Sequence, residues 1–389
     1  MNAHERFTVL FIALYTEMGG GEVAVYHLLK ELDKSRCEPV LLVNAEGALT
    51  EAVRGLGVRT EILPFRTVML KELIRPSVFV RVMNDATMVT KFLETNRVDI
   101  IHCGDVLSLA LIAPAVIRKK IPVVYSVIFF YEWTRLILFI MLALGTVSTI
   151  VTNSFLIEED LRRRMVLMGQ TVRTVYPGVD GEAFRPKRTG ERNVLREELH
   201  IPKSVKLIGT IGRIDPMKGQ LVFLRAAEQL LRTRNDLKFL IVGNVQNENI
   251  MPFLREYEEQ LKNFVASRGL QEQVLFLGHR NDIPDVLRSL DVAVCPSVSE
   301  GFGLSVAEAY AVGIPVVTSN AVGIIELLRN EQGMFIAETG DSNSFASGIE
   351  QALAYGTESV PVHRPAKPGG WDVQARTLEE CYQQLIHQS

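Results

Sequence analysis

The chain has 389 residues, of which 47% are hydrophobic and 22% are charged, as is usual for a globular protein. This length favours at least two domains, each large enough to bury its own core. The formal net charge of −3 excludes the strongly basic character of many nucleic-acid-binding proteins, so no nucleic-acid partner is expected.

The cysteine pattern indicates a reducing compartment. Four cysteines lie far apart, with no Cys-x-x-Cys pair and no neighbouring His cluster. They are therefore expected to be buried thiols, not a zinc site or a disulfide framework. The apolar run at 7–15 leads into a glycine-rich turn instead of a signal-peptide cleavage site, so we expect a first strand there and a cytoplasmic chain.

Short apolar runs alternate with helical patterns, which is typical of parallel α/β sheets. A strand at 7–14 is followed by a turn at 19–21 and an amphipathic helix at 22–33. Further strands of the first half are expected at 39–43, 99–102, 122–127 and 149–152. Turn residues end this half at Pro186, and a polar linker follows at 187–193.

A second α/β series begins with a strand at 206–214. Further strands are expected at 239–242, 274–277, 292–295 and 315–318. A Pro- and Gly-rich loop at 356–370 precedes a last helix at 372–387. The sequence therefore predicts two Rossmann-like halves, whose ligands would bind at the carboxyl ends of the strands.

The most informative run is 299–308, between an apolar strand and a short helix. Its two glycines let backbone N–H groups approach a ligand, and the helix that follows points its positive end at the same place. Glu300 and Glu308 flank this anion-attracting turn, so they fit better as acceptors for hydroxyl groups than as phosphate ligands. The pattern suggests a ligand with phosphates and hydroxyls, such as a nucleotide sugar. The alternative is a pair of carboxylates that only stabilises the helix start, by roughly 0.3–1 kcal/mol each.

A second motif at 212–219 follows a strand and opens a helix. Arg213 and Lys218 would place two cations beside a helix N-terminus, an arrangement suited to a pyrophosphate. The alternative is a solvated helix start. No Asp-x-Asp metal motif occurs in a matching context, so no metal site is expected.

The run from Asp291 to Leu328 resembles the donor-binding core of retaining glycosyltransferases of the GT-B fold, specifically glycosyltransferase family 4. The matching text is PSVSEGFGLSVAEAYAVGIPVVT at 296–318 and GIIE at 323–326. The resemblance implies an α/β fold of two Rossmann-like domains facing across a cleft, with a C-terminal helix that crosses back. The acceptor domain would then comprise residues 1–186 and 371–389, and the donor domain residues 187–370.

The resemblance also implies roles. Arg213 and Lys218 would bind the donor phosphates and stabilise the departing nucleotide diphosphate, Glu300 would contact the transferred sugar, and Glu308 would hold the ribose. The other donor-binding residues that it implies are Gly20, Gly21, Gly212, Arg280, Ile283, Gly301, Phe302, Gly303 and Leu304. No residue obviously serves as the nucleophile of a double displacement, so the resemblance implies front-face displacement without a metal or another cofactor.

Two of these loops carry weaker signals. The glycines at 18–21 form neither a P-loop nor a dinucleotide fingerprint, so a tight turn with no ligand stays open. The loop at 278–283 corresponds to the family's loop near the nucleotide base, where the contacts would come mainly from backbone.

The first half departs from the family at one point. Many relatives have a His after the fourth or fifth strand, whereas this chain reads Ile-Phe-Phe-Tyr at 128–131. His102, Asp105 and Glu132 are the candidates for lining the acceptor side, although a lone His at a strand end is more often structural. The departure bears on donor identity and activity more than on the fold.

An apolar stretch at 136–151 is interrupted by Gly and Thr and is too short for a spanning helix. A buried helix followed by a strand is favoured. The alternative is a peripheral membrane contact through 129–144 that would bring the enzyme to a lipid-linked acceptor.

Together these features predict a hexosyltransferase that moves a sugar from a nucleotide-diphosphate sugar to a sugar or lipid-linked acceptor, in polysaccharide, lipopolysaccharide or glycolipid synthesis. Two alternatives stay open. A non-hydrolysing nucleotide-sugar epimerase would isomerise its donor without an acceptor, and a non-catalytic binding protein would bind nucleotide without turnover.

Overall fold

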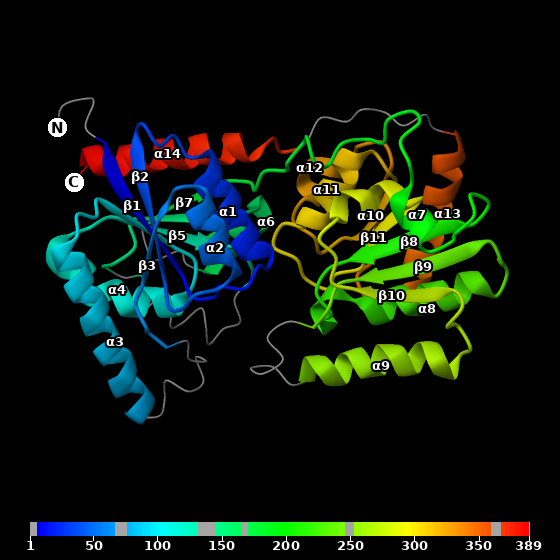
Figure 1. Ribbon diagram of the computed structural model, residues 1–389, viewed down its shortest axis with the longest axis horizontal. Coiled ribbons are helices and arrows are strands. Elements are labelled where there is room, and N and C mark those ends of the chain that lie inside the picture. The colour runs from blue at the N-terminus through cyan, green and yellow to red at the C-terminus, as the bar shows by residue number, and fades with distance from the viewer. Residues whose placement is uncertain are drawn as a thin grey trace. The chain divides into compact units, whose positions relative to one another are not determined.

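The computed structural model describes residues 6–66, 76–130, 143, 145–164, 170–245, 253–358 and 367–388. The chain divides into two compact units (Figure 1). Unit 1 comprises Met1–Gly178 and Trp371–Ser389, and unit 2 comprises Val179–Gly370.

Unit 1 contains a seven-stranded parallel sheet of order β3-β2-β1-β4-β5-β6-β7. Its strands are β1 (Phe7–Ala13), β2 (Cys37–Val43), β3 (Arg59–Ile62), β4 (Ile100–Cys103), β5 (Val123–Val127), β6 (Thr149–Thr152) and β7 (Thr171–Thr174). Its described helices are α1 (Gly20–Glu31), α2 (Ala48–Gly55), α3 (Pro76–Thr95), α4 (Val106–Lys119), α6 (Phe155–Arg164) and α14 (Trp371–Gln388).

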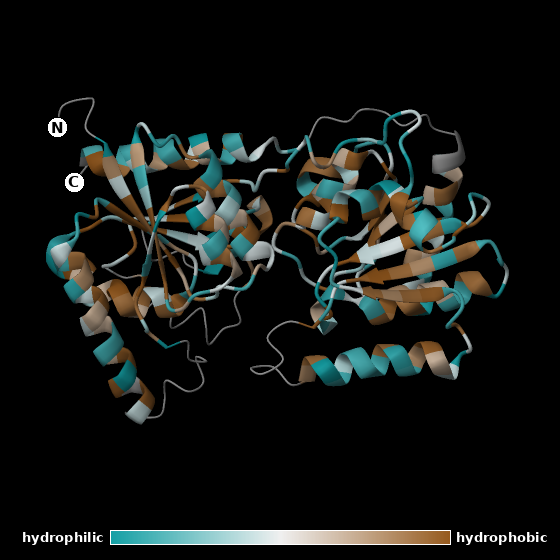
Figure 2. Ribbon diagram, viewed as in Figure 1, coloured by the Kyte–Doolittle hydropathy of each residue, from teal (hydrophilic) through white to brown (hydrophobic). Residues whose placement is uncertain are grey.

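Both faces of this sheet are buried, because side chains alternate along each strand and helices cover both sides. In β1, Leu10 and Ile12 pack in a core with α3, α4 and α6. Val9 and Phe11 face the other way and pack with α1, α2 and α14. Figure 2 shows the result as largely hydrophobic strands between helices with hydrophilic outer sides.

Unit 2 contains a six-stranded parallel sheet of order β10-β9-β8-β11-β12-β13. Its strands are β8 (Lys206–Ile211), β9 (Leu237–Val242), β10 (Val274–Gly278), β11 (Val292–Cys295), β12 (Val316–Ser319) and β13 (Met334–Ala337). Its helices are α7 (Val194–Glu198), the 3₁₀ turn η2 (Pro216–Lys218), α8 (Gln220–Leu231), α9 (Phe253–Ser267), α10 (Ile283–Ser289), α11 (Leu304–Val312), α12 (Ile325–Leu328) and α13 (Ser342–Glu358).

The expected α/β class with two Rossmann-like domains is confirmed. In each sheet the strand order reverses direction once, between β1 and β4 in unit 1 and between β8 and β11 in unit 2. Such a switch point opens a crevice at the carboxyl ends of the strands, where ligands of these folds bind. Each unit therefore has its own candidate site.

All the strands expected from the sequence are present, but three others were not foreseen. β3, β7 and β13 are each four residues long and only partly buried, so they lack a long apolar run. Several boundaries also differ, and the strand expected at 206–214 ends at Ile211. Helix α1 begins inside the glycine turn, and the expected loop at 356–370 starts later because α13 continues to Glu358.

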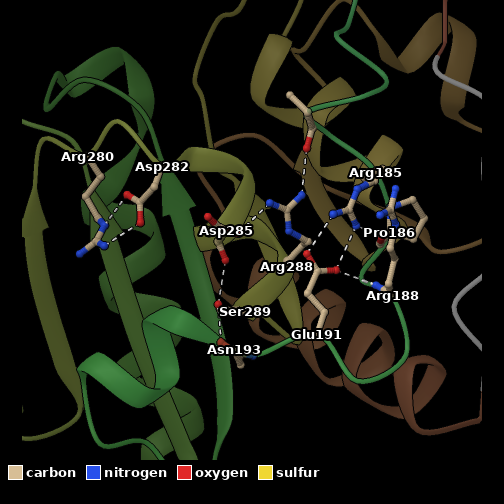
Figure 3. Close-up of polar contacts among 11 residues, drawn as sticks. Arg185, Pro186, Arg188, Glu191, Asn193, Arg280, Asp282, Asp285, Arg288 and Ser289 are labelled. Carbon is tan, nitrogen blue, oxygen red and sulfur yellow. Dashed lines mark hydrogen bonds and ion pairs between the residues drawn. The ribbon is translucent and has the colours of Figure 1, made fainter.

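The boundary between the units lies earlier than the expected one at 186/187, because the segment after Gly178 binds to α10. Arg288 donates from Nη1 to the carbonyl oxygen of Ala183 at 2.9 Å, and Arg185 pairs with Glu191 through two hydrogen bonds of 3.0 and 2.9 Å (Figure 3). These contacts join the expected end of the first half to unit 2.

Most of the apolar stretch at 129–144 lies outside the described residues, including the whole of 131–142. The expected membrane contact there stays a prediction. In the part of the chain that is described, no helix combines the length and the apolar character required to cross a bilayer.

Candidate functional site

Two loops meet at the switch point of unit 2. One follows β8 and the other follows β11, and they are joined by a hydrogen bond of 2.8 Å from Val298 N to the oxygen of Met217. Gly219 has φ of +70°, and a Cβ atom there would lie 2.0 Å from the carbonyl oxygen of Pro296. Only glycine allows the two backbones to approach so closely.

This approach brings Lys218 and Glu300 together. The Lys218 ammonium pairs with the Glu300 carboxylate, and both side chains are about one-quarter exposed or less, at 27% and 20%. The same carboxylate accepts a hydrogen bond of 3.3 Å from Ser297 Oγ. Two site residues that the sequence predicted separately, on distant motifs, are therefore in direct contact.

Arg213 lies on the β8 loop with its side chain 44% exposed, so its guanidinium can reach a ligand. Asp215 accepts from Arg213 Nη2 at 3.1 Å and from the backbone N–H of Met217 at 2.9 Å. One carboxylate therefore both orients the arginine and caps η2.

Sequence reasoning did not single out Asp215 or Gln220. Gln220 donates from Nε2 to the carbonyl oxygen of Arg213 at 2.7 Å, while its Oε1 is buried and has no hydrogen-bond partner among the described residues. Asp followed by Pro is a recognisable start for a helical turn, and this signal could have identified Asp215 as the cap.

Gly212 lies where the β8 loop leaves the sheet, with φ of +156°. Its N–H donates to the oxygen of Val242 at 2.9 Å. A Cβ atom on Gly243 would lie 2.0 Å from the oxygen of Gly212, so the neighbouring β9 loop also needs a glycine. The backbone that carries Arg213 is thus fixed from both sides.

The second glycine of the β11 loop has a specific structural role. Gly303 precedes α11 with φ of +100°, and a Cβ atom there would meet Val322 Cγ1 at 2.4 Å. Phe302 is buried and accepts a hydrogen bond of 2.7 Å from Ile324 N. Gly301 is buried beside it, and Leu304 is the first residue of α11, as expected.

Glu308 lies one turn into α11. Burial raises the pKa of this carboxyl from 4.5 to about 8, although part of the residue reaches solvent. At neutral pH the group is therefore largely protonated. A carboxylic acid both donates and accepts hydrogen bonds, which suits a ligand hydroxyl.

The Arg280 side chain is not free to contact a ligand, because two carboxylates already bind it. Its guanidinium makes hydrogen bonds of 2.7 and 2.8 Å with Asp282 (Figure 3). It makes two more, of 2.8 and 2.9 Å, with Glu198, and these contacts with both carboxylates raise the pKa of Arg280 above its usual range. The side chain is thus occupied in fixing the β10 loop. Ile283 follows as the first residue of α10.

The glycine turn of unit 1 is partly helical. Gly20 and Gly21 are the first two residues of α1. A Cβ atom on Gly20 would meet nothing within 4 Å, and one on Gly21 would meet Ile128 Cδ1 at an ordinary 3.6 Å. Neither glycine is required by the backbone itself.

The other described candidates of unit 1, His102 and Asp105, have structural roles. His102 is buried, with Nδ1 2.5 Å from Tyr382 Oη on α14 and Nε2 2.7 Å from Ser126 Oγ, and burial lowers its pKa to about 4. Asp105 caps α4 by accepting from Ser108 N at 2.9 Å. Glu132 lies outside the described residues.

Within the described residues, no three His, Cys, Asp or Glu side chains are grouped so as to hold a metal ion. The positive charge of the unit 2 site comes from Arg213 and Lys218. What the arrangement can do is bind an anion beside two cations and hold hydroxyl groups on two carboxyls.

Two tandem Rossmann-like units, with a charged site at the switch point of the second, define the GT-B class of glycosyltransferases. Comparisons with known proteins agree. The family model "Glycosyltransferase Family 4" matches residues 18–183, and "Glycosyl transferases group 1" matches residues 191–360. The chain belongs to the family 4 glycosyltransferases.

Two curated relatives are each 32% identical. The lipopolysaccharide core biosynthesis mannosyltransferase LpsB of Rhizobium meliloti aligns over 223 residues, 54% of this chain and 60% of that protein. The UDP-Gal:alpha-D-GlcNAc-diphosphoundecaprenol alpha-1,3-galactosyltransferase of Escherichia coli aligns over 174 residues, 44% of this chain and 42% of that protein. The chain thus spans less than two thirds of either relative.

Among solved structures, the chain resembles the HepE protein of Anabaena, crystallised with UDP and glucose. The TM-score is 0.76 at 20% identity, over 97% of this chain and 100% of that one. At this identity the likeness shows the fold alone.

Proposed function

We propose that this chain transfers a hexose from a nucleotide-diphosphate sugar to an acceptor hydroxyl, with retention of anomeric configuration and without a metal. The observation that carries the proposal is the contact of Lys218 with Glu300 beside Arg213, at the switch point of unit 2. Fixed cations at this point would stabilise the charge that develops on a departing diphosphate.

Donor binding would rearrange the Lys218–Glu300 pair. The ammonium pairs with the carboxylate in this structure, and a diphosphate would offer the ammonium a stronger anionic partner. Glu300 would then be free to accept from hydroxyls of the transferred sugar. Glu308, largely protonated at neutral pH, would hold the ribose hydroxyls.

In the proposed step, the bond between the anomeric carbon and the diphosphate oxygen breaks, and the acceptor oxygen bonds to the same face of that carbon. The acceptor proton passes to the departing diphosphate oxygen. Atoms and charge balance without another reactant, and Arg213 and Lys218 hold the dianionic product.

The names of the relatives suggest acceptors of the cell envelope, either a lipopolysaccharide core or a lipid-linked sugar diphosphate. We therefore propose a sugar or lipid-linked acceptor, with unit 1 at the inner face of a membrane. Ile128 and Phe129 would contribute to that contact, since they are 40% and 39% exposed just after β5.

Calorimetry with UDP, GDP and ADP, each in EDTA and again in Mg²⁺, tests the donor site. We expect one nucleotide to bind equally in both buffers and at least 100-fold more weakly to Arg213→Ala/Lys218→Ala. The matched control is Arg192→Ala/Lys262→Ala, which removes two exposed cations of the same unit.

Failure of all three nucleotides to bind, or equal binding by both double variants, would overturn the donor site. Incubating the corresponding nucleotide sugar without acceptor separates the alternatives. Isomerised sugar would identify an epimerase, and nucleotide binding without turnover on any envelope acceptor would identify a binding protein.

A further inference from the structure

A hollow of about 520 Å³ lies on unit 2 between α8, α9 and the start of α13. It is lined by Arg225, Glu228, Gln229, Arg232, Phe264, Arg268, Ser342 and Asn343. Helix α8 packs against both α9 and α13, so the walls belong to one packed layer (Figure 1). No residue of the donor site lines it.

Three guanidiniums and one carboxylate face this hollow, which leaves a formal charge of +2. Glu228 divides its two oxygens between Arg268 at 3.2 Å and Arg232 at 3.6 Å. A guanidinium has five N–H donors, so both arginines keep donors to spare. Arg225 is exposed and forms no ion pair with any described residue.

The arginines are positioned by the helices. Arg225 lies on α8 and Arg232 directly follows the last residue of α8, seven residues further along, which is two helical turns on the same face. Arg268, just beyond α9, has its guanidinium over the Phe264 ring, 3.8 Å from the ring centroid, and this cation–π contact holds it beside the hollow. All three cations line the hollow, and Arg225 and Arg232 are also open to solvent, with the Arg232 side chain 71% exposed.

Neutral polar groups complete the lining. Gln229 donates to Ser342 Oγ at 3.2 Å, and Asn343 adds an amide at the first turn of α13. Amide and hydroxyl groups of this kind hold hydroxyls, while clustered guanidiniums favour phosphate. The volume is within the usual range for small-molecule sites.

We propose that this hollow binds a small phosphorylated molecule that carries hydroxyl groups, at a site separate from the donor site. Its phosphate lies among Arg225, Arg232 and Arg268, and its hydroxyls reach Gln229 and Asn343. The proposal does not depend on the transferase activity. Helix α8 starts at the donor loop with Gln220 and carries Arg225 five residues further on, so the two sites share one rigid element.

Calorimetry with glucose 6-phosphate as the probe, and glucose as the unphosphorylated control, tests this site. We expect glucose 6-phosphate to bind the full chain and glucose not to bind. Arg225→Ala/Arg268→Ala should weaken binding at least tenfold. Arg213→Ala/Lys218→Ala and the exposed-cation control Arg192→Ala/Lys262→Ala should leave it unchanged.

Absence of binding, equal binding of glucose, or unchanged binding by Arg225→Ala/Arg268→Ala would overturn the proposal. Loss of binding in Arg213→Ala/Lys218→Ala alone would assign the probe to the donor site and also overturn it. If the pocket double variant does not fold, Arg225→Ala replaces it, because this side chain has no ion pair to lose among the described residues. Nucleotide binding by the pocket variants tests the donor site independently.

Discussion

The first six strands of each unit share one order, to which unit 1 adds β7, but the two units use the polar residues at their switch points differently. In unit 2, Arg213, Lys218 and Glu300 are partly exposed on loops that glycines hold together. In unit 1, His102 is buried between two partners and Asp105 caps a helix. The charged groups of unit 2 are therefore open to a ligand, while the described polar candidates of unit 1, His102 and Asp105, hold its fold.

The largest expected effect is a loss of transfer rate that leaves the fold intact. Lys218→Ala should lower the transfer rate about 100- to 1000-fold, because it removes a fixed cation beside the leaving group. The free energy of unfolding should change by only about 1 kcal/mol, since the ion pair is partly exposed. Transfer kinetics and urea unfolding measure the two quantities, with Lys262→Ala as the control. A stability loss that accounts for the whole rate loss would contradict the assignment.

The second prediction concerns the glycine that joins the two loops. Gly219→Ala should lower the free energy of unfolding by about 3 kcal/mol, because its Cβ would lie 2.0 Å from a backbone oxygen. Gly269→Ala is the matched control, with φ of +66° and nothing within 4 Å, and should cost only about 1 kcal/mol. Equal costs in chemical denaturation would show that the loops do not need this approach.

This contrast also explains what the sequence could predict. The unit 2 site is encoded locally, by runs at 212–219 and 299–308 that each follow a buried strand, so both motifs were predicted. The contact of Lys218 with Glu300 could not be predicted, because it requires β8 and β11 to be neighbours in the sheet and no local sequence pattern indicates that. The structural role of His102 could not be predicted from the sequence either, because its imidazole is held by Tyr382, 280 positions away. The edge strand β3 is four residues long and lacks a continuous apolar pattern.

The third prediction uses the raised pKa of Glu308. The folded chain keeps this proton up to about pH 8, whereas the unfolded chain loses it near 4.5, so the group's contribution to stability falls as pH rises between these values. Glu308→Gln lacks this dependence. From pH 5.5 to 7 the variant should gain up to about 2 kcal/mol relative to wild type, at ~1.4 kcal/mol per pH unit. Chemical denaturation at both pH values measures this difference. The exposed control Glu259→Gln should change in unfolding free energy between the two pH values as wild type does. If Glu308→Gln also changes in parallel with wild type, Glu308 is not protonated in the folded chain.

The smallest effect tests the structural role of His102. Tyr382→Phe removes the hydroxyl 2.5 Å from Nδ1 and leaves that buried nitrogen without its partner, which should cost about 1–2 kcal/mol of stability. Tyr355→Phe, on the partly exposed side of α13, is the control and should cost less. Because burial lowers the pKa of His102 to about 4 while the unfolded ring titrates near 6.5, this residue's contribution to stability is present above pH 6.5 and is lost as pH falls toward 4.

Tyr382→Phe also tests whether His102 is only structural, as the contrast between the two units requires. If His102 only anchors α14, the variant should be less stable, yet bind nucleotide and turn over acceptor as wild type does below its unfolding transition. A raised KM for acceptor with unchanged stability would instead place the His102 ring in acceptor recognition. In that case the Tyr382 hydroxyl would set which nitrogen of the His102 ring carries the proton that faces the acceptor. The switch point of unit 1 would then take part in substrate recognition, as we propose for that of unit 2.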